Sequence, residues 1–381
     1  MSGPTERAAS QWPNRGGRVV PFARPPLSSP PARRHRHADP ILTDRIPTER
    51  DTMTDKVLVT RRVAPEALAK LRRFVEQVDV HEGNTALSEA ELIERVGDAT
   101  GLLVPGDVIS AAVVAAAPRL RAVAAVSVGY NNLDIGAMNA RGILATNTPD
   151  VLTDTTADLG WALMMATARR VTEAEHYLRA GRWREWQADL LLGQDVHHST
   201  LGIIGMGRIG QAIARRARGF DMNVLYHNRS RLDEAVERSL AAEWVAKDEL
   251  FRRADHVVVV VPYSPATRHL IGTAELALMK PTATLTNIAR GGVVDEEALL
   301  AVLRDRRIAG AGLDVFEGEP DFRKGFLDLD NVVLLPHIGS ASAATRFKMA
   351  DLAVDNLIAA LNLGPHAGRP AHVVNPEARR G

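Results

Sequence analysis

The 381-residue chain contains no cysteine, which excludes disulfide bonds, thiolate metal sites and a cysteine nucleophile. Aromatic residues make up only 4% of it, and its formal net charge is +1. Such a balanced charge offers no broad field to attract nucleic acid or an anionic membrane. The densest apolar run, residues 257–261, is far too short to span a bilayer. We therefore expect no nucleic-acid or membrane partner, and a cysteine-free chain suits the cytoplasm.

The chain is long enough for two domains, and its hydrophobic content of 45% is ordinary for a globular protein. Residues 1–54 differ from the rest, being rich in Pro and Arg and poor in periodic apolar residues. We expect a disordered N-terminal extension with no catalytic role. An organelle transit peptide is the alternative, but the stretch carries acidic residues and no clear amphipathic helix. Met53 opens a segment that looks like a natural protein start.

Strand-like and helical segments alternate from residue 56 onward, which predicts parallel β-α-β units. Short apolar strands are expected at 57–60, 101–104 and 120–128, with a helix at 65–74. A long helix is expected at 154–180, a second strand–helix series at 201–335, and a last helix at 341–361. The predicted fold class is α/β, with two successive parallel-sheet halves.

A glycine-rich turn connects an expected strand to a helix at 211–219. Its sequence is Gly205-Met206-Gly207-Arg208-Ile209-Gly210. In this pattern the first glycine permits a tight turn, the second admits a pyrophosphate, and the third lets helix pack on strand. The free N–H groups and the dipole of the helix favour an anion at its start. The turn therefore predicts a dinucleotide site.

The following strand, 223–227, ends in Asn228-Arg229-Ser230-Arg231. A site that prefers NAD usually has an acidic residue here, which binds the ribose 2′-hydroxyl. This chain instead has two guanidinium groups and a hydroxyl, which suit a 2′-phosphate. A solvated basic loop is the alternative. We predict NADPH as the preferred cofactor, with NADH as a second one.

Three downstream segments each end an expected strand with a polar side chain, namely Arg290, Glu319 and His337. Taken singly, each has an ordinary structural explanation. Together they meet the demands of ketone reduction, which needs a hydride on carbon and a proton on oxygen. His337 is a natural acid near neutral pH, and Glu319 would fix its tautomer. Arg290 would grip a carboxylate and stabilise the developing alkoxide, with no metal required.

From about residue 57 to 374 the chain resembles the D-isomer-specific 2-hydroxyacid dehydrogenase family, most closely its glyoxylate/hydroxypyruvate reductase branch. The segments that carry the likeness are 126–134, 147–158, the glycine turn, 287–291, 313–320 and 336–341. The resemblance implies that Arg290, Glu319 and His337 are the catalytic residues. It implies a substrate-carboxylate site at Ser127, Val128 and Gly129. It also implies cofactor contacts from 206–209, from 228–230, and from Ile288, Ala289, Asp314 and Gly339.

The resemblance implies two Rossmann-like, doubly wound parallel-sheet domains with a cleft between them. The substrate domain would take 55–150 and 338–370, the NAD(P)-binding domain 151–337, and a tail 371–381. The helix at 154–180 is apolar around much of its girth, and the resemblance implies that it packs in a homodimer.

Two departures from the family bear on the substrate. Asn131 stands where many relatives have Asp, and 190–192 is Leu-Leu-Leu where some hydroxypyruvate reductases place a Trp that reaches the neighbouring subunit. Glyoxylate or hydroxypyruvate is the expected substrate, giving glycolate or D-glycerate. The alternatives are another D-2-hydroxyacid dehydrogenase, of 2-ketogluconate, phenylpyruvate or D-lactate type, and a non-catalytic NAD(P)-sensing regulator.

Overall fold

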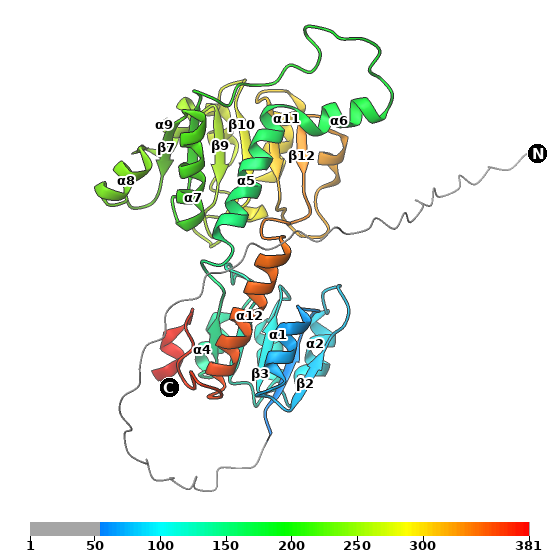
Figure 1. Ribbon diagram of the computed structural model, residues 1–381, viewed down its shortest axis with the longest axis vertical. Helices are drawn as coiled ribbons and strands as arrows, with labels where there is room; N and C mark the ends of the chain where they lie inside the picture. The colour runs from blue at the N-terminus through cyan, green and yellow to red at the C-terminus, as the bar shows by residue number, and fades with distance from the viewer. Residues whose placement is uncertain (1–53, 381) are drawn as a thin grey trace, which may run out of the picture. The chain divides into compact units, whose positions relative to one another are not determined.

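The computed structural model describes residues 54–380. The expectations for residues 1–53 lie outside this part of the chain. Two parallel sheets organise the described residues, in agreement with the predicted α/β class (Figure 1). Away from the edges, the strands of both sheets are short, buried and largely apolar, as expected when helices cover both faces.

The first sheet has five parallel strands in the order β2-β1-β3-β4-β5. Its strands are β1 (Lys56–Val59), β2 (Gln77–Val80), β3 (Gly101–Val104), β4 (Ala122–Ala125) and β5 (Leu144–Thr146). One apolar core fills the face covered by α1 (Pro65–Leu71) and α12 (Ala343–Ala360). A second fills the face covered by α2 (Glu89–Val96), α3 (Ala111–Ala116) and α4 (Ile135–Ala140).

The second sheet has seven parallel strands in the order β12-β11-β10-β9-β6-β7-β8. These are β6 (Thr200–Ile204), β7 (Asn223–His227), β8 (Ala242–Trp244), β9 (His256–Val259), β10 (Thr284–Asn287), β11 (Gly310–Leu313) and β12 (Val332–Leu334). Helices α5 (Thr153–Ala168), α7 (Arg208–Ala217) and α8 (Glu234–Leu240) contribute to the core on one face. Helices α9 (Lys247–Arg253), α10 (Thr273–Leu278) and α11 (Glu296–Arg304) contribute to the core on the other.

Residues from opposite ends of the described chain pack on the same sheet. Helix α12 follows the seven-stranded sheet in sequence but contacts β3, β4 and α1 of the five-stranded one. Figure 1 shows α12 against that sheet and α5 across the face of the other. Beyond residue 370, where we expected a tail, Val373 bridges Thr146 and the buried Asn375 donates to the Ile143 carbonyl.

The single long helix expected at 154–180 is wrong. Helix α5 ends at Ala168, and a separate helix, α6 (Val171–Arg179), follows. Between them Arg170 has a left-handed backbone, with φ of 54°. Its guanidinium binds Glu173 through two 2.7 Å contacts and donates to the Leu192 carbonyl. No glycine or proline marks this break, so the apolar pattern could not reveal it.

Among the described residues, no helix combines the length and apolar character needed to cross a membrane.

Candidate active site

The glycine-rich turn lies where the strand order of the seven-stranded sheet reverses, between β6 and β9. This switch point is where open α/β sheets bind ligands. Gly205 has φ of +105°, and a Cβ on Gly210 would lie 2.2 Å from the Gly205 carbonyl oxygen. At Gly207, directly before α7, a Cβ would meet nothing within 4 Å. A tight turn, a close helix and open space at the helix start fit the pyrophosphate of a dinucleotide.

The loop after β7 is held against the glycine turn. Asn228 Oδ1 accepts the Met206 N–H at 2.6 Å, and Trp244 Nε1 donates to the Asn228 carbonyl at 3.2 Å. Arg229 and Ser230 are exposed, and Arg229 has no ion pair within residues 54–380. Arg231 differs, because its guanidinium forms an ion pair with the carboxylate of Glu237, which neutralises its charge.

Arg208, another expected cofactor residue, pairs through Nε with Asp150 at 2.5 Å. Ile209 is half-buried, and Ile288 and Ala289 are buried directly after β10. These residues thus follow the carboxyl ends of β6 and β10, at the same edge of the sheet as the glycine turn.

Arg290 reaches from the end of β10 to the turn that follows β4. Its Nε donates to Asn131 Oδ1 at 3.2 Å, and its Nη1 donates to the Ala289 carbonyl at 2.7 Å. A Cβ on Gly129 would lie 2.0 Å from Arg290 Nη2. Burial lowers the pKa of Arg290, against the opposing charge of Glu319. Sequence reasoning noted Asn131 only as a departure and did not foresee this contact.

The turn 127–129 is itself fixed by hydrogen bonds. Ser127 Oγ donates to the Gly129 carbonyl at 2.6 Å, and Asn147 Nδ2 donates to the Val128 carbonyl at 2.8 Å. The N–H groups of Val128 and Gly129 have no acceptor within residues 54–380. Two free N–H groups beside a guanidinium form a place where an anion is favoured.

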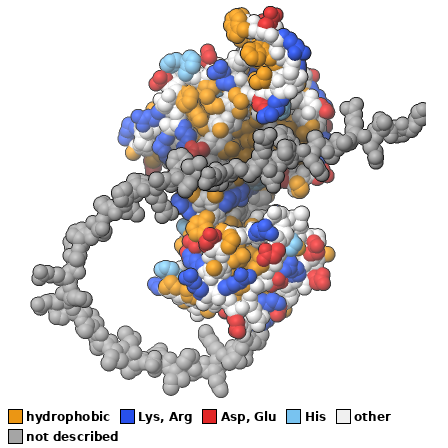
Figure 2. All heavy atoms as spheres, turned by 45° about the vertical axis from the view of Figure 1, so that its right-hand side comes forward, with side chains coloured by type: hydrophobic (Ala, Val, Ile, Leu, Met, Phe, Trp, Pro, Cys, Tyr) orange, Lys and Arg blue, Asp and Glu red, His pale blue; other side chains and the backbone are white. Residues whose placement is uncertain are grey.

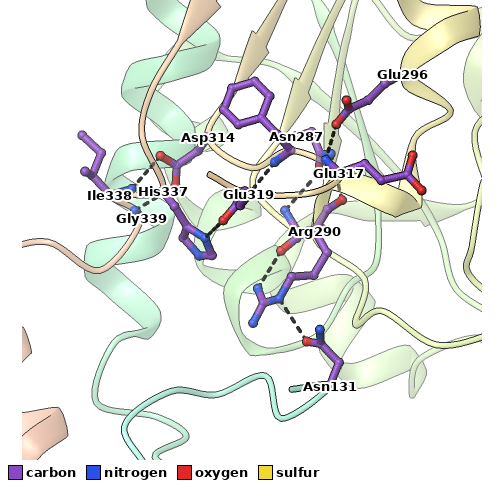
Figure 3. A network of polar contacts seen from close by, with 12 residues as sticks. Asn131, Asn287, Arg290, Glu296, Asp314, Glu317, Glu319, His337, Ile338 and Gly339 are labelled. Atoms are coloured by element: carbon purple, nitrogen blue, oxygen red, sulfur yellow. Dashed lines mark hydrogen bonds and ion pairs between the residues drawn. The ribbon is translucent and has the colours of Figure 1, made fainter. Parts of the chain in front are cut away.

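His337 and Glu319 form a direct pair, with His337 Nδ1 2.7 Å from Glu319 Oε2 (Figure 3). Glu319 Oε1 accepts the Phe316 N–H at 2.7 Å. Burial opposes ionisation of Glu319, but the bond from His337 and the Phe316 N–H, together with Arg290, lower its pKa overall. Glu319 is therefore the acceptor and Nδ1 the donor, and Nε2 of His337 has no hydrogen-bond partner among residues 54–380.

The turn that carries His337 is held in a strained conformation by Asp314. His337 has φ of 53°, a left-handed value that costs a non-glycine residue about 1–3 kcal/mol. Asp314, at the end of β11, accepts the Ile338 and Gly339 N–H groups at 2.7 and 2.8 Å. Burial raises the pKa of Asp314 against these bonds. Both carboxylate oxygens of Asp314, an expected cofactor contact, thus already accept N–H groups from the turn that carries His337.

Glu296 supports the turn that carries Glu319, a role that sequence reasoning missed. This buried residue at the start of α11 accepts the Glu317 N–H at 2.5 Å. Its second oxygen is buried with no partner within the described residues. Burial raises the pKa of Glu296, against the bond from Glu317. A carboxyl group directly after a helix-capping Asp295 gives no sequence signal of burial, so only the structure could reveal it.

Of the three expected catalytic side chains, Glu319 and His337 are bonded to each other, and the charge of Arg290 acts on Glu319 without a direct hydrogen bond (Figure 3). Among residues 54–380, no cluster of three or more His, Asp or Glu side chains could hold a metal ion.

Helix α6 and the segment 180–195 that follows it expose apolar side chains. No residue of α6 is buried, and Trp183 and Trp186 are 54% and 79% exposed. Figure 2 shows hydrophobic side chains at the upper end of the molecule, where this segment lies. By contrast, Leu163 and Met164 of α5 are buried within the chain, and Trp161 packs on Phe220 with ring centroids 5.0 Å apart. The apolar residues of α5 therefore pack in the chain's own core and do not by themselves indicate a dimer contact, and the homodimer implied by the resemblance stays a prediction.

Comparison with known proteins identifies a matching family and similar proteins. The model for the D-isomer specific 2-hydroxyacid dehydrogenase NAD-binding domain matches residues 161–339. The glyoxylate reductase of Thermococcus onnurineus is 50% identical over 81% of this chain and 94% of its own length. The glyoxylate/hydroxypyruvate reductase B of Yersinia enterocolitica is 46% identical over 77% of this chain and 91% of its own.

A solved structure shares the arrangement. The NADPH-dependent glyoxylate/hydroxypyruvate reductase of Sinorhizobium meliloti, crystallised with NADP and malonate, superimposes with a TM-score of 0.74 at 34% identity. The match covers 86% of this chain and 98% of that one.

Proposed function

The chain belongs to the D-isomer-specific 2-hydroxyacid dehydrogenase family, in its glyoxylate/hydroxypyruvate reductase branch, and we propose that it reduces glyoxylate or hydroxypyruvate to glycolate or D-glycerate. The observation that carries this proposal is the bonded Glu319–His337 pair with the charge of Arg290 acting on it, at the strand ends. The names of the similar proteins support the choice of substrate.

In the proposed mechanism the substrate carboxylate binds the N–H groups of Val128 and Gly129, beside Arg290. These N–H groups have no acceptor within the described residues, and the turn that presents them is fixed by Ser127 and Asn147. The guanidinium also polarises the carbonyl, because burial removes competing water and strengthens its field. Arg290 therefore serves both to orient the keto acid and to stabilise negative charge on its oxygen.

His337 acts as the general acid. Glu319 accepts from Nδ1 at 2.7 Å, so the proton that reaches the carbonyl oxygen leaves from Nε2. The cofactor, when bound, supplies the hydride. Asp314 holds the turn in which His337 lies, and Glu319 stabilises the positive charge of the imidazolium before transfer. In the reverse direction the neutral imidazole accepts the proton.

We infer that NADPH is the preferred cofactor, with NADH used less well. The support is the absence of an acidic side chain at 228–231 and the exposed guanidinium of Arg229 beside Ser230. The protein would work in the cytoplasm as a homodimer, with the surface of α6 and 180–195 in the contact. Large exposed tryptophans are typical of such interfaces.

A panel of substrates tests the proposal. The purified chain would be assayed for NADPH and NADH oxidation with glyoxylate, hydroxypyruvate, pyruvate and phenylpyruvate. We expect turnover to be fastest with NADPH and one of the first two acids. Faster turnover with phenylpyruvate or pyruvate would assign another 2-hydroxyacid dehydrogenase, and no turnover with any acid would refute the enzymatic function.

A further inference from the structure

Two buried residues, Tyr226 and Glu237, hold the loop that follows β7 together with the exposed Arg231. Tyr226 is fully buried in β7, and its hydroxyl donates to Glu237 Oε1 at 2.5 Å while accepting the Leu232 N–H at 2.9 Å. Glu237, on α8, is 5% exposed. Arg231 binds it through two parallel contacts, Nε to Oε1 at 2.9 Å and Nη2 to Oε2 at 2.7 Å.

This pairing persists at any working pH. The bonds from Arg231, then that from Tyr226, lower the pKa of Glu237 to about 2. Burial first, and then the adjacent carboxylate, raise the pKa of Tyr226 to about 12. Glu237 is therefore an anion and Tyr226 a neutral donor throughout the physiological range.

The consequence concerns the charge that the loop offers a ligand. Of its two guanidinium groups, that of Arg231 already has a full carboxylate partner in bidentate geometry, although its side chain is 63% exposed. Arg229 has no ion pair within residues 54–380. A neutralised pair attracts a phosphate much less than a bare guanidinium does.

We propose that Glu237 is a specificity-determining residue: by neutralising Arg231 it leaves Arg229 as the cation that distinguishes NADPH from NADH. Because only one guanidinium of the loop is then unpaired within the described residues, the preference for NADPH over NADH is moderate, and NADH remains usable. This inference rests on the proposed function, because it needs the loop to bind the 2′-phosphate. Arg231, paired with Glu237, then contributes little charge to the discrimination between the two cofactors.

The test is direct binding of NADP⁺ and NAD⁺ to the full chain by titration calorimetry, without turnover. The variants are Glu237→Gln and the double substitution Arg231→Gln/Glu237→Gln. Tyr226→Phe is the matched control, because it removes the hydroxyl's bonds to Glu237 and to the Leu232 N–H and leaves the ion pair intact. The measured quantity is the ratio of NADP⁺ to NAD⁺ affinity, at low and at high salt.

We expect Glu237→Gln to raise this ratio about twofold to fivefold, the usual worth of one exposed ion pair. The gain should vanish at high salt, where exposed charges are screened. The double variant and Tyr226→Phe should keep the wild-type ratio. An unchanged or lower ratio in Glu237→Gln would overturn the inference.

The double variant also decides the matter alone if Glu237→Gln fails to fold. A wild-type ratio supports neutralisation of Arg231, whereas a lowered ratio means that Arg231 contacts the phosphate itself and overturns it. Wild-type protein that binds neither nucleotide would instead refute the proposed function, and this inference with it.

Discussion

The guanidinium of Arg290 lies against the backbone of Gly129, so close that a Cβ there would lie 2.0 Å from Nη2 and force the guanidinium to move. The two residues come from different sheets, one after β10 and the other after β4. Their contact joins the expected carboxylate-binding turn to the residue that would polarise the carbonyl. Asn131, which accepts from Nε at 3.2 Å, fixes the same guanidinium from the side.

Gly129→Ala should lower kcat/KM by about tenfold to 100-fold, because the new methyl group displaces the guanidinium by about an ångström. The neighbour is the end of a flexible side chain, so thermal stability should barely change. Steady-state kinetics with a melting curve checks both. Activity equal to that of the wild type would mean that Arg290 does not act from this position. Gly136→Ala is the control, since a Cβ there meets only Asp134 at 3.4 Å.

Arg290→Lys should lower kcat by about 10²- to 10³-fold, the usual effect of losing one aimed donor of negative-charge stabilisation. The loss should deepen at alkaline pH. Burial lowers the pKa of the group at this position, and a lysine starts from a lower value than an arginine. The pH profile of kcat from neutral to alkaline conditions measures this. A constant ratio of variant to wild type across that range would contradict the burial argument.

Glu319→Gln should lose activity and also change how stability depends on pH. The pKa of Glu319 is depressed below its ordinary 4.5, so its ionised form stabilises the folded state above that value. This stability is lost as pH falls through the folded pKa. The difference in unfolding free energy between wild type and variant should therefore be constant above about pH 4.5 and shrink below it. Urea titrations at several acidic pH values would reveal a difference that grows towards acid if the sign is wrong.

Glu296→Gln should change the pH dependence of the unfolding free energy in the opposite direction from Glu319→Gln. Burial raises the pKa of Glu296 above 4.5, so folding favours its protonated form and loses stability as pH rises through the folded pKa. The amide keeps an oxygen for the Glu317 N–H and carries no charge. The variant should therefore gain stability relative to wild type between pH 4 and pH 8. Equal pH dependence of the two proteins in urea would show that Glu296 ionises freely.

The sequence predicted the parallel α/β architecture correctly because buried parallel strands and glycine turns leave local signals. Strand β9 reads His256-Val-Val-Val259, and the glycine turn follows β6 as expected. The predicted catalytic set also rested on local cues, since Arg290, Glu319 and His337 each follow a strand. The structure bonds Glu319 to His337, and the catalytic roles of the three residues stay a prediction.

What the sequence could not reveal depends on which polar groups pair in the fold. At the helix break, Arg170 pairs with Glu173 and donates to the Leu192 carbonyl, and no helix-breaking residue marks the position. Likewise Arg231 looked like a phosphate ligand, and only the fold brings the buried Glu237 to it. Charge in a loop sequence says nothing about which charges are already neutralised.

Replacement of Trp183 and Trp186 by serine should weaken or abolish the proposed homodimer. A buried interface tryptophan is worth about 2 kcal/mol or more, so each substitution should raise the dissociation constant by about 30-fold. Sedimentation or light scattering over a dilution series measures the shift to monomer. Val108→Ser is the matched control, because Val108 is a 63% exposed apolar residue after β3, away from this segment. A control that dissociates as readily as the tryptophan variant, or a wild type that is monomeric at micromolar concentration, would refute the dimer contact through α6 and 180–195.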